Sequence, residues 1–173
     1  MLNRRDFLKG LAITGVALSY SGFVLGAIKK DSMEAPLFPV TVDGKRGFIN
    51  SKGTVVIKPQ FDRGWVFSEG LAAIRMGDKY GYIDKKGTMI IEPKFKDAYP
   101  FSEGLAAVLL SGDKKCGYID RTGRMVIKPQ FDEAFSFSEG LASVVIEDRW
   151  GYIDKAGRVA IKPQFEGAWD LLE

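Results

Sequence analysis

Two sets of acidic side chains recur along the chain at a nearly constant spacing, and such acids could bind calcium or act as acid–base pairs. One set lies in a Phe-Ser-Glu-Gly-Leu-Ala block, and the other ends a Gly-Tyr-Ile-Asp block. The members are Glu69, Glu103, Glu139, Asp84, Asp120 and Asp154. A residue present in every copy of a block is explained most simply by the block's own structure, so we expect turn formation rather than metal binding or catalysis.

The chain has one cysteine, Cys116, and no histidine. A nucleophilic thiol needs a base beside it, usually histidine, and zinc sites use several cysteines or histidines. One cysteine also cannot form an internal disulfide. We therefore expect no catalytic residues, no cofactor and no metal site, and we expect Cys116 to pack as a small apolar side chain. The protein is not expected to be an enzyme.

The charge balance argues against a polyanionic partner. The formal net charge is +3, and residues 1–26 carry +2 of it because Arg4, Arg5 and Lys9 face only Asp6. The rest of the chain is close to neutral, with basic and acidic residues interleaved. We therefore expect no binding to nucleic acid and no electrostatic attachment of the body to a membrane.

The N-terminus reads as an export signal. Residues 3–9, Asn-Arg-Arg-Asp-Phe-Leu-Lys, resemble the twin-arginine signature, and a mildly apolar stretch follows from Leu11 to Leu25. That stretch is shorter than the roughly 20 residues that span a bilayer. We predict a twin-arginine signal peptide over residues 1–27, with a signal helix, whose export residues are Arg4, Arg5, Phe7 and Leu8. The resemblance implies contact with the twin-arginine translocation machinery and a periplasmic or secreted location.

Two alternatives for this leader stay open. A basic segment before an apolar stretch also suits the general secretory route. The small-residue cleavage site around Gly26 and Ala27 is loose. An uncleaved leader would anchor the protein, and this leader would then be the only part in contact with the membrane.

The rest of the chain repeats one motif in tandem. A Gly-Phe/Tyr-Ile-Asn/Asp block begins at Gly47, Gly81, Gly117 and Gly151, in steps of 34, 36 and 34 residues. The Phe-Ser-Glu-Gly-Leu-Ala block begins at Phe67, Phe101 and Phe137, and a Pro-Gln/Lys-Phe block begins at Pro59, Pro93, Pro129 and Pro163. Three blocks in one order at one period indicate internal duplication.

One repeat reads as three short strands. Gly81–Asp84 is rich in aromatic and β-branched residues and runs into a turn that ends at Gly87. The return strand Met89–Glu92 ends at Pro93, which lacks a ladder donor. Leu105–Leu109 then reads as the first strand of the next unit. The unit is therefore a three-stranded antiparallel meander.

These strands predict an all-β fold, a tandem array of four meanders with about 12 strands and no helix outside the leader. The segment Leu37–Val42 supplies the first strand, residues 28–36 form a linker, and residues 37–173 form the repeat domain. One small meander is marginal alone, so neighbouring units must share a core. We expect that core at Ile49, Ile83, Ile119, Ile153, Ile57, Ile91, Ile127 and Ile161, with Phe61, Phe95, Phe131 and Phe165 between units. We favour an open array over a closed ring.

The repeat resembles that of the bacterial WG-repeat proteins, in which Trp-Gly-Tyr-Ile-Asp precedes a Lys-Gly turn, an apolar strand and Phe-Ser-Glu-Gly-Leu-Ala. The resemblance covers about Arg46 to Trp169. Trp150 keeps the tryptophan that gives the family its name, whereas Tyr80, Cys116 and Arg46 replace it elsewhere. The resemblance implies a β-rich repeat array without known catalytic residues, and Arg46 suggests an atypical first unit.

A ladder of aromatic residues recurs between the blocks: Trp65, Tyr99, Phe135 and Trp169. If these rings are exposed they could stack on sugars or grip an extended peptide, but we favour burial between repeats. We predict a non-catalytic exported protein that acts as a protein- or peptide-interaction module in the cell envelope, with an unknown envelope protein or peptide as partner. The alternative is an envelope carbohydrate-binding module that uses the ladder.

Overall fold

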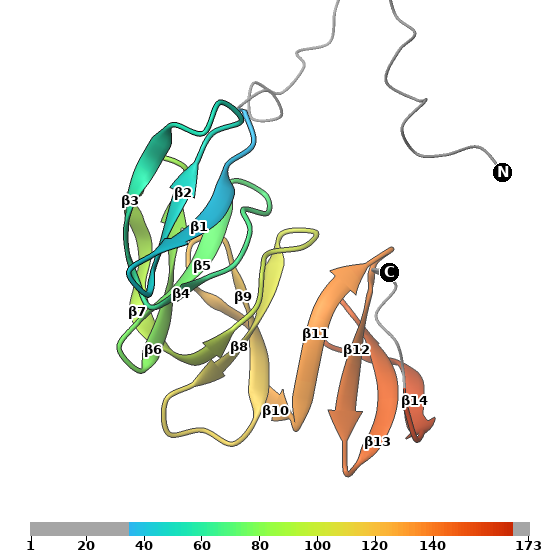
Figure 1. Ribbon diagram of the computed structural model, residues 1–173. Helices are drawn as coiled ribbons and strands as arrows, with labels where there is room; N and C mark the ends of the chain where they lie inside the picture. Colours follow the sequence, from blue (N-terminus) through green and yellow to red (C-terminus); the bar gives the residue numbers. More distant parts are fainter. Residues whose placement is uncertain (1–34, 168–173) are drawn as a thin grey trace, which may run out of the picture. The chain divides into compact units, whose positions relative to one another are not determined.

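The computed structural model describes residues 35–167, and all the regular structure in that range is β-strand (Figure 1). No helix in this range is long and apolar enough to span a bilayer. The predicted export residues, the signal helix and Trp169 lie outside the described residues, as does most of the predicted linker.

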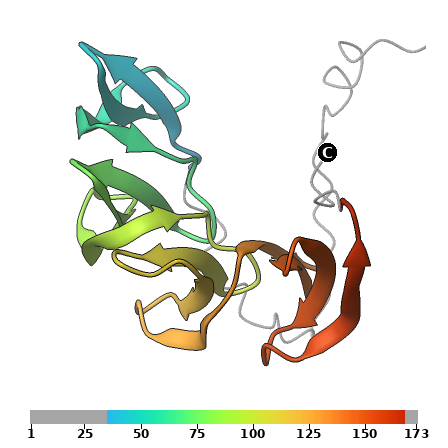
Figure 2. The ribbon, with the colours of Figure 1, turned by 90° about the horizontal axis from the view of Figure 1, so that it is seen from below.

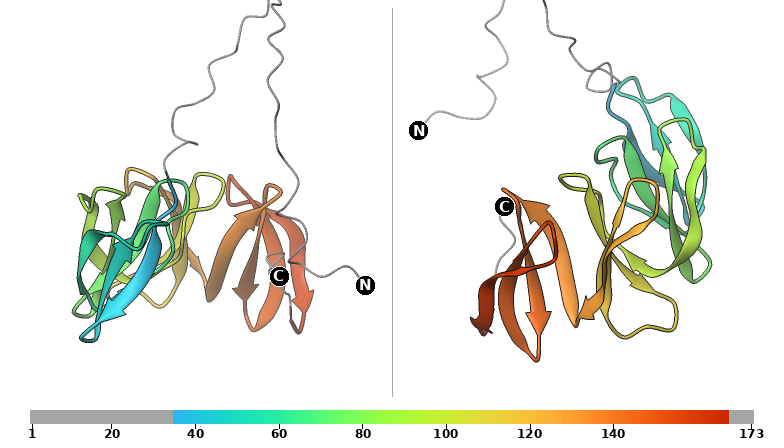
Figure 3. Two further views of the ribbon diagram at one scale, coloured as in Figure 1. Left: turned by 45° about the horizontal axis from the view of Figure 1, so that its top comes forward. Right: turned by 180° about the vertical axis from the view of Figure 1, so that it is seen from behind.

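Four antiparallel meanders follow one another along the chain (Figures 2 and 3). The first has β1 (Phe38–Val42), β2 (Lys45–Ile49) and β3 (Val55–Phe61), and the second has β5 (Leu71–Met76), β6 (Lys79–Asp84) and β7 (Met89–Ala98). The third has β8 (Leu105–Leu110), β9 (Cys116–Asp120) and β10 (Met125–Phe131), and the fourth has β12 (Leu141–Ile146), β13 (Arg149–Asp154) and β14 (Val159–Phe165). The predicted tandem array of meanders is confirmed.

The segments expected to be loops between units contain additional strands. These are β4 (Arg63–Gly64), β11 (Glu133–Ser138) and the end of β7. Each pairs with the first strand of the following unit, through Gly64↔Ile74, Asp97↔Leu109 and Glu133↔Val145. The described residues therefore contain 14 strands rather than about 12. The sequence did not reveal them because β4 is only two residues long and the pairing partner of each segment belongs to the next unit.

The recurring aspartates form turns, as predicted. The Oδ1 atom of Asp84 accepts hydrogen bonds from the backbone N–H groups of Lys86 at 2.9 Å and Thr88 at 2.8 Å. The N–H of Gly87, at φ +83°, donates to the backbone carbonyl of Asp84 at 2.9 Å. A positive φ suits glycine because it has no Cβ. The same arrangement recurs at Asn50, Asp120 and Asp154.

The recurring glutamates are also structural, and they join neighbouring units. Glu69 and Gly70 both have positive φ and form a two-residue hairpin turn, which is closed by hydrogen bonds between Ser68 and Leu71. The carboxylate of Glu69 accepts a hydrogen bond from the N–H of Gly104 in the next turn at 3.0 Å. The Oγ of Ser68 donates to the backbone carbonyl of Phe101 at 2.6 Å. Glu103 and Ser102 repeat these two bonds to Gly140 and Phe137.

Each core cluster combines residues of two neighbouring units. Ile57 and Phe61 of the first meander pack in one cluster with Ile83 of the second. Ile119 likewise joins the cluster of the second meander, and Ile153 joins that of the third. The shared core is therefore confirmed, and Phe95 and Phe131 are buried as predicted.

The prediction is wrong at both ends of the described array. Ile49 is half-buried, Ile161 is 37% exposed and Phe165 is 42% exposed. Interior isoleucines are covered by the turn glycine of the next unit. Ile57 lies against Gly87, Ile91 against Gly123 and Ile127 against Gly157. No unit in the described range covers β14 in this way, so its apolar side chains stay exposed.

Candidate functional site

The ladder residues lie on the short segments that connect one meander to the next. The backbone N–H of Trp65 donates to the carbonyl of Ala73 at 2.9 Å, and that of Tyr99 donates to the carbonyl of Ala107 at 3.0 Å. The first strand of the following unit therefore positions each ring. Trp65 is 46% exposed, whereas Tyr99 and Phe135 are half-buried. The expectation that the ladder is buried between repeats is thus wrong for Trp65, because this connection crosses the surface.

The recurring block tyrosines support the ladder through hydrogen bonds. The hydroxyl of Tyr82 donates to the backbone carbonyl of Tyr99 at 2.8 Å, and the hydroxyl of Tyr118 donates to that of Phe135 at 2.8 Å. Burial raises the pKa of Tyr82, so its hydroxyl keeps the proton that makes this bond. The first unit has Phe48 at the equivalent position, which has no hydroxyl to donate.

Two of the ladder rings contact each other. The ring centroids of Tyr99 and Phe135 lie 6.1 Å apart in a tilted arrangement. Phe135 also stacks on Trp150, at 5.1 Å between centroids and 25° between ring planes. Within residues 35–167, no aromatic ring packs against Trp65. Within the ladder, Tyr99 and Phe135 thus form a packed pair, whereas Trp65 is more exposed to solvent.

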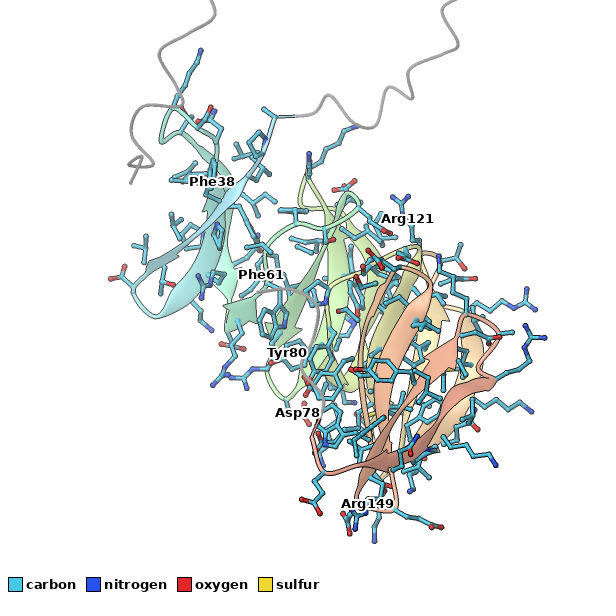
Figure 4. The ribbon with its side chains drawn as sticks, turned by 90° about the vertical axis from the view of Figure 1, so that its right-hand side faces the viewer. Phe38, Phe61, Asp78, Tyr80, Arg121 and Arg149 are labelled. Atoms are coloured by element: carbon cyan, nitrogen blue, oxygen red, sulfur yellow. The ribbon has the colours of Figure 1, made fainter. Side chains whose placement is uncertain are left out.

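One surface pocket lies beside Trp65 and measures about 400 Å³. We call it the Trp65 pocket. Its lining residues are Arg46, Asp62, Arg63, Gly64, Trp65 and Tyr80. Tyr80, labelled in Figure 4, is 8% exposed and belongs to the position that precedes the block glycine, as does Arg46. Trp65 is the only ladder residue in this lining.

The second pocket, which we call the Cys116 pocket, measures about 410 Å³ and occupies the equivalent place two repeats later. Its lining residues are Asp97, Tyr99, Leu109, Cys116, Asp132, Glu133, Ala134 and Phe135. Cys116 takes the place of Arg46 before the block glycine, and Phe135 takes the place of Trp65. Tyr99, the ladder ring of the repeat between them, also lines this pocket. The two pockets thus present ladder rings in the same way but carry different charges.

Cys116 is half-buried and packs against the core around Phe131. Burial, aided by the negative charges of Asp97 and Glu133, raises the pKa of the thiol. The thiol therefore stays protonated near neutral pH and is a poor nucleophile. Its packing agrees with the predicted role of a small apolar side chain.

The aspartates that line the pockets are engaged in structural contacts. Asp62 accepts a hydrogen bond from Lys45 at 2.6 Å and another from the N–H of Gly77 at 2.7 Å, and these bonds lower its pKa. Asp132 makes the equivalent bonds with Lys115 at 2.5 Å and the N–H of Glu147 at 3.0 Å, and its pKa is lowered for the same reason. Both carboxylates are ionised at neutral pH.

The remaining charged groups of the two pockets have opposite sign. Arg46 and Arg63 line the Trp65 pocket, whereas Asp97 and Glu133 line the Cys116 pocket. Sequence reasoning singled out the rings and missed these neighbours. The sequence does contain a signal for the charge of each pocket, in the residue two positions before each ladder aromatic. That residue is Arg63, Asp97 and then Glu133.

The described residues contain no cluster of three or more His, Cys, Asp or Glu side chains that could hold a metal ion. The recurring acids instead bind backbone N–H groups in separate turns. The site therefore consists of two aromatic pockets with fixed charges.

A family model described as "WG containing repeat" matches residues 47–80, 80–114, 117–150 and 150–172. These four matches cover well over half of the chain and follow the glycine-to-glycine period of the sequence. No curated protein shows significant similarity to the chain.

Proposed function

The chain belongs to the family of WG containing repeats, and from this premise we propose that it is a non-catalytic module that binds a protein or peptide segment through its two aromatic pockets. We place it in the cell envelope, in the periplasm or secreted, because of the twin-arginine-like leader with Arg4 and Arg5. The leader would engage the translocation machinery, and an envelope protein or peptide would be the partner.

The observation that carries this proposal is the spacing of the ladder. The centroids of Tyr99 and Phe135 lie 6.1 Å apart. Alternate residues of an extended peptide lie about 6.6 Å apart, because a strand rises roughly 3.3 Å per residue. Tyr99 and Phe135 can therefore contact side chains i and i+2 of one extended segment, which is how a strand presents one face.

Ring contacts favour a peptide over a sugar at the second pocket. A sugar stacks on an open aromatic face, but Phe135 already stacks on Trp150 at 5.1 Å. The ionised groups beside the rings also match peptide side chains better than a neutral sugar. The carbohydrate alternative rests on one observation, the 46% exposure of Trp65.

A displayed library of random 12-residue peptides, selected on the immobilised protein, tests the proposal. We expect enriched peptides that lose at least about tenfold in affinity for a Trp65→Ser variant. Phe38→Ser is the matched control, since Phe38 is 47% exposed and lies outside both pockets (Figure 4). Equal affinity for both variants contradicts the proposal. Binding to isolated cell-wall polymer that is lost only in Trp65→Ser supports the carbohydrate alternative.

The export half of the proposal has its own test. Replacing Arg4 and Arg5 together by lysine keeps the leader's positive charge but removes the paired guanidinium groups. We expect the variant to accumulate in the cytoplasm, measured by cell fractionation in a bacterium with a twin-arginine pathway. Export that continues unchanged would instead support the general secretory route, which needs only a basic segment.

A further inference from the structure

We propose that the Trp65 pocket is a subsite for the carboxylate of an aspartate or glutamate side chain of the bound peptide, held by the guanidinium groups of Arg46 and Arg63. The exposed ring of Trp65 packs against the peptide beside that acid. This inference rests on the proposed function and adds to it the chemistry of one bound residue.

The two arginines lack an acidic partner in the described part of the chain. Ion pairs there join Lys45 to Asp62, Lys115 to Asp132, Lys155 to Glu103, Arg149 to Glu166 and Arg158 to Asp154. Arg46 and Arg63 take part in none of them, nor in any side-chain hydrogen bond within that range. Both arginines therefore line the pocket without a side-chain acceptor among residues 35–167.

The pocket carries an excess of positive charge. Asp62 is its one acid, and that acid is already paired with Lys45 at 2.6 Å. Arg75 lies near enough to Asp62 to help lower its pKa, and the Nε of Arg75 is buried without a hydrogen-bond partner. An anion in the pocket would gain from these charges in a partly desolvated place.

The local sequence makes room for Arg46. A Cβ atom at Gly64 would lie 3.0 Å from the Cγ of Arg46, so the arginine stem runs along the bare backbone of this glycine. The equivalent residues beside Tyr80 and Cys116 are Ala98 and Ala134. An arginine at the pre-glycine position and a glycine two residues after Asp62 therefore occur together only in this unit of the four.

A carboxylate suits this site better than a phosphate group. A guanidinium plane matches a carboxylate with two parallel hydrogen bonds. The oxygens of Asp62 in the same lining disfavour a second negative charge on the ligand. In the Cys116 pocket the equivalents of Arg63 are Asp97 and Glu133, so that pocket disfavours an acid. The acidic side chain of the peptide should therefore bind in the Trp65 pocket rather than in the Cys116 pocket.

A double-mutant cycle on the full chain tests the subsite. Library-selected peptides should share an Asp or Glu at one position of their common motif. Replacing that acid by its amide should weaken binding to the wild-type protein by about tenfold or more, and by less than about threefold to an Arg46→Gln/Arg63→Gln variant. Lys128→Gln is the matched control, since Lys128 is exposed on β10 outside both pockets, and it should keep the tenfold effect. Thermal melts check that all variants are folded.

The outcomes separate this inference from the function beneath it. Selected peptides without a shared acid, or an amide effect equal in the wild type and the double arginine variant, overturn the subsite and leave peptide binding standing. Displacement of the acidic peptide by inorganic phosphate at lower concentration than by acetate overturns the choice of carboxylate. Selection that enriches no peptide overturns both the proposed function and the subsite.

Discussion

The same five residues, Ile-Lys-Pro-Gln-Phe, occur on β3, β10 and β14, and their burial differs between copies. On β10, Ile127 is 3% exposed and Phe131 is 1% exposed. On β14, Ile161 is 37% exposed and Phe165 is 42% exposed. Identical local sequence with identical strand structure therefore has two burial states. The exposure of the two copies differs because a following meander packs on β10, whereas none in residues 35–167 packs on β14.

The contact that buries the interior copies is specific. The side chain of Ile127 lies against the turn glycine of the next unit, where a Cβ on Gly157 would be 2.9 Å from its Cγ2. Gly53 has the same turn and nearly the same φ, +79° against +78°, but a Cβ atom there would meet nothing within 4 Å. Neighbouring units are therefore packed together through an isoleucine of one unit and the turn glycine of the next.

The largest difference between the two burial states should appear at the phenylalanines. We expect Phe131→Ala to lower the free energy of unfolding by about 3–5 kcal/mol, because it leaves a cavity between two units. Phe165→Ala should cost less than about 1.5 kcal/mol, because much of that ring is already in water. Urea unfolding followed by fluorescence measures both. Equal losses would show that β14 is covered in solution.

The turn glycines give a smaller contrast. Alanine at either Gly157 or Gly53 must adopt a left-handed conformation, at a cost of about 1–2 kcal/mol. At Gly157 the new methyl group would also clash with Ile127, which adds about 1–3 kcal/mol. Melting temperatures should therefore fall further for Gly157→Ala than for Gly53→Ala. Matching melting temperatures would contradict the proposed isoleucine–glycine packing.

The smallest expected difference is in how the free energy of unfolding depends on pH. Glu103 accepts hydrogen bonds from Lys155 at 2.8 Å and from the N–H of Gly140 at 3.1 Å, and both lower its pKa below the usual 4.5. A lowered pKa contributes stability above pH 4.5 that is lost as the pH falls through the folded-state pKa. The stability lost in Glu103→Gln should therefore be greater at about pH 7 than at about pH 3.

Glu139 is the matched control for this measurement. It occupies the same turn position, but its carboxylate accepts no hydrogen bond from any residue in the range 35–167. Urea unfolding of Glu139→Gln should therefore differ little from the wild type at both pH values. A pH-dependent loss as large as that of Glu103→Gln would mean that the bonds to the next unit do not explain the effect.

Local chemistry made part of this structure predictable. The Asp-to-Gly turns follow from side-chain capping and a positive φ, and Asp84 and Gly87 form them as expected. Recurrence of an isoleucine two residues before the proline of each return strand pointed to Ile91 and Ile127 as core residues, and both are 3% exposed. These features depend on neighbours only a few residues away, which a sequence displays directly.

The pockets were less predictable. The ladder position of Trp65 was evident, but its exposure and its proximity to Arg46 and Arg63 were not. Arg46 lies on β2 and Trp65 follows β4, with the whole of β3 between them in the sequence. The position of Trp65 is set by the pairing of β4 with β5, which belongs to the next unit. A spacing in sequence cannot report which side of the sheet a connection crosses.

By itself, the sequence determined the repeat, its period, its turns and the three-stranded unit, because turn residues and strand alternation act over short distances. Tertiary structure alone decided which copy of Ile-Lys-Pro-Gln-Phe is buried and which charges surround each ladder ring. The physical reason is that burial and electrostatic surroundings belong to pairs of units, and the same residues acquire them only when another unit packs against them.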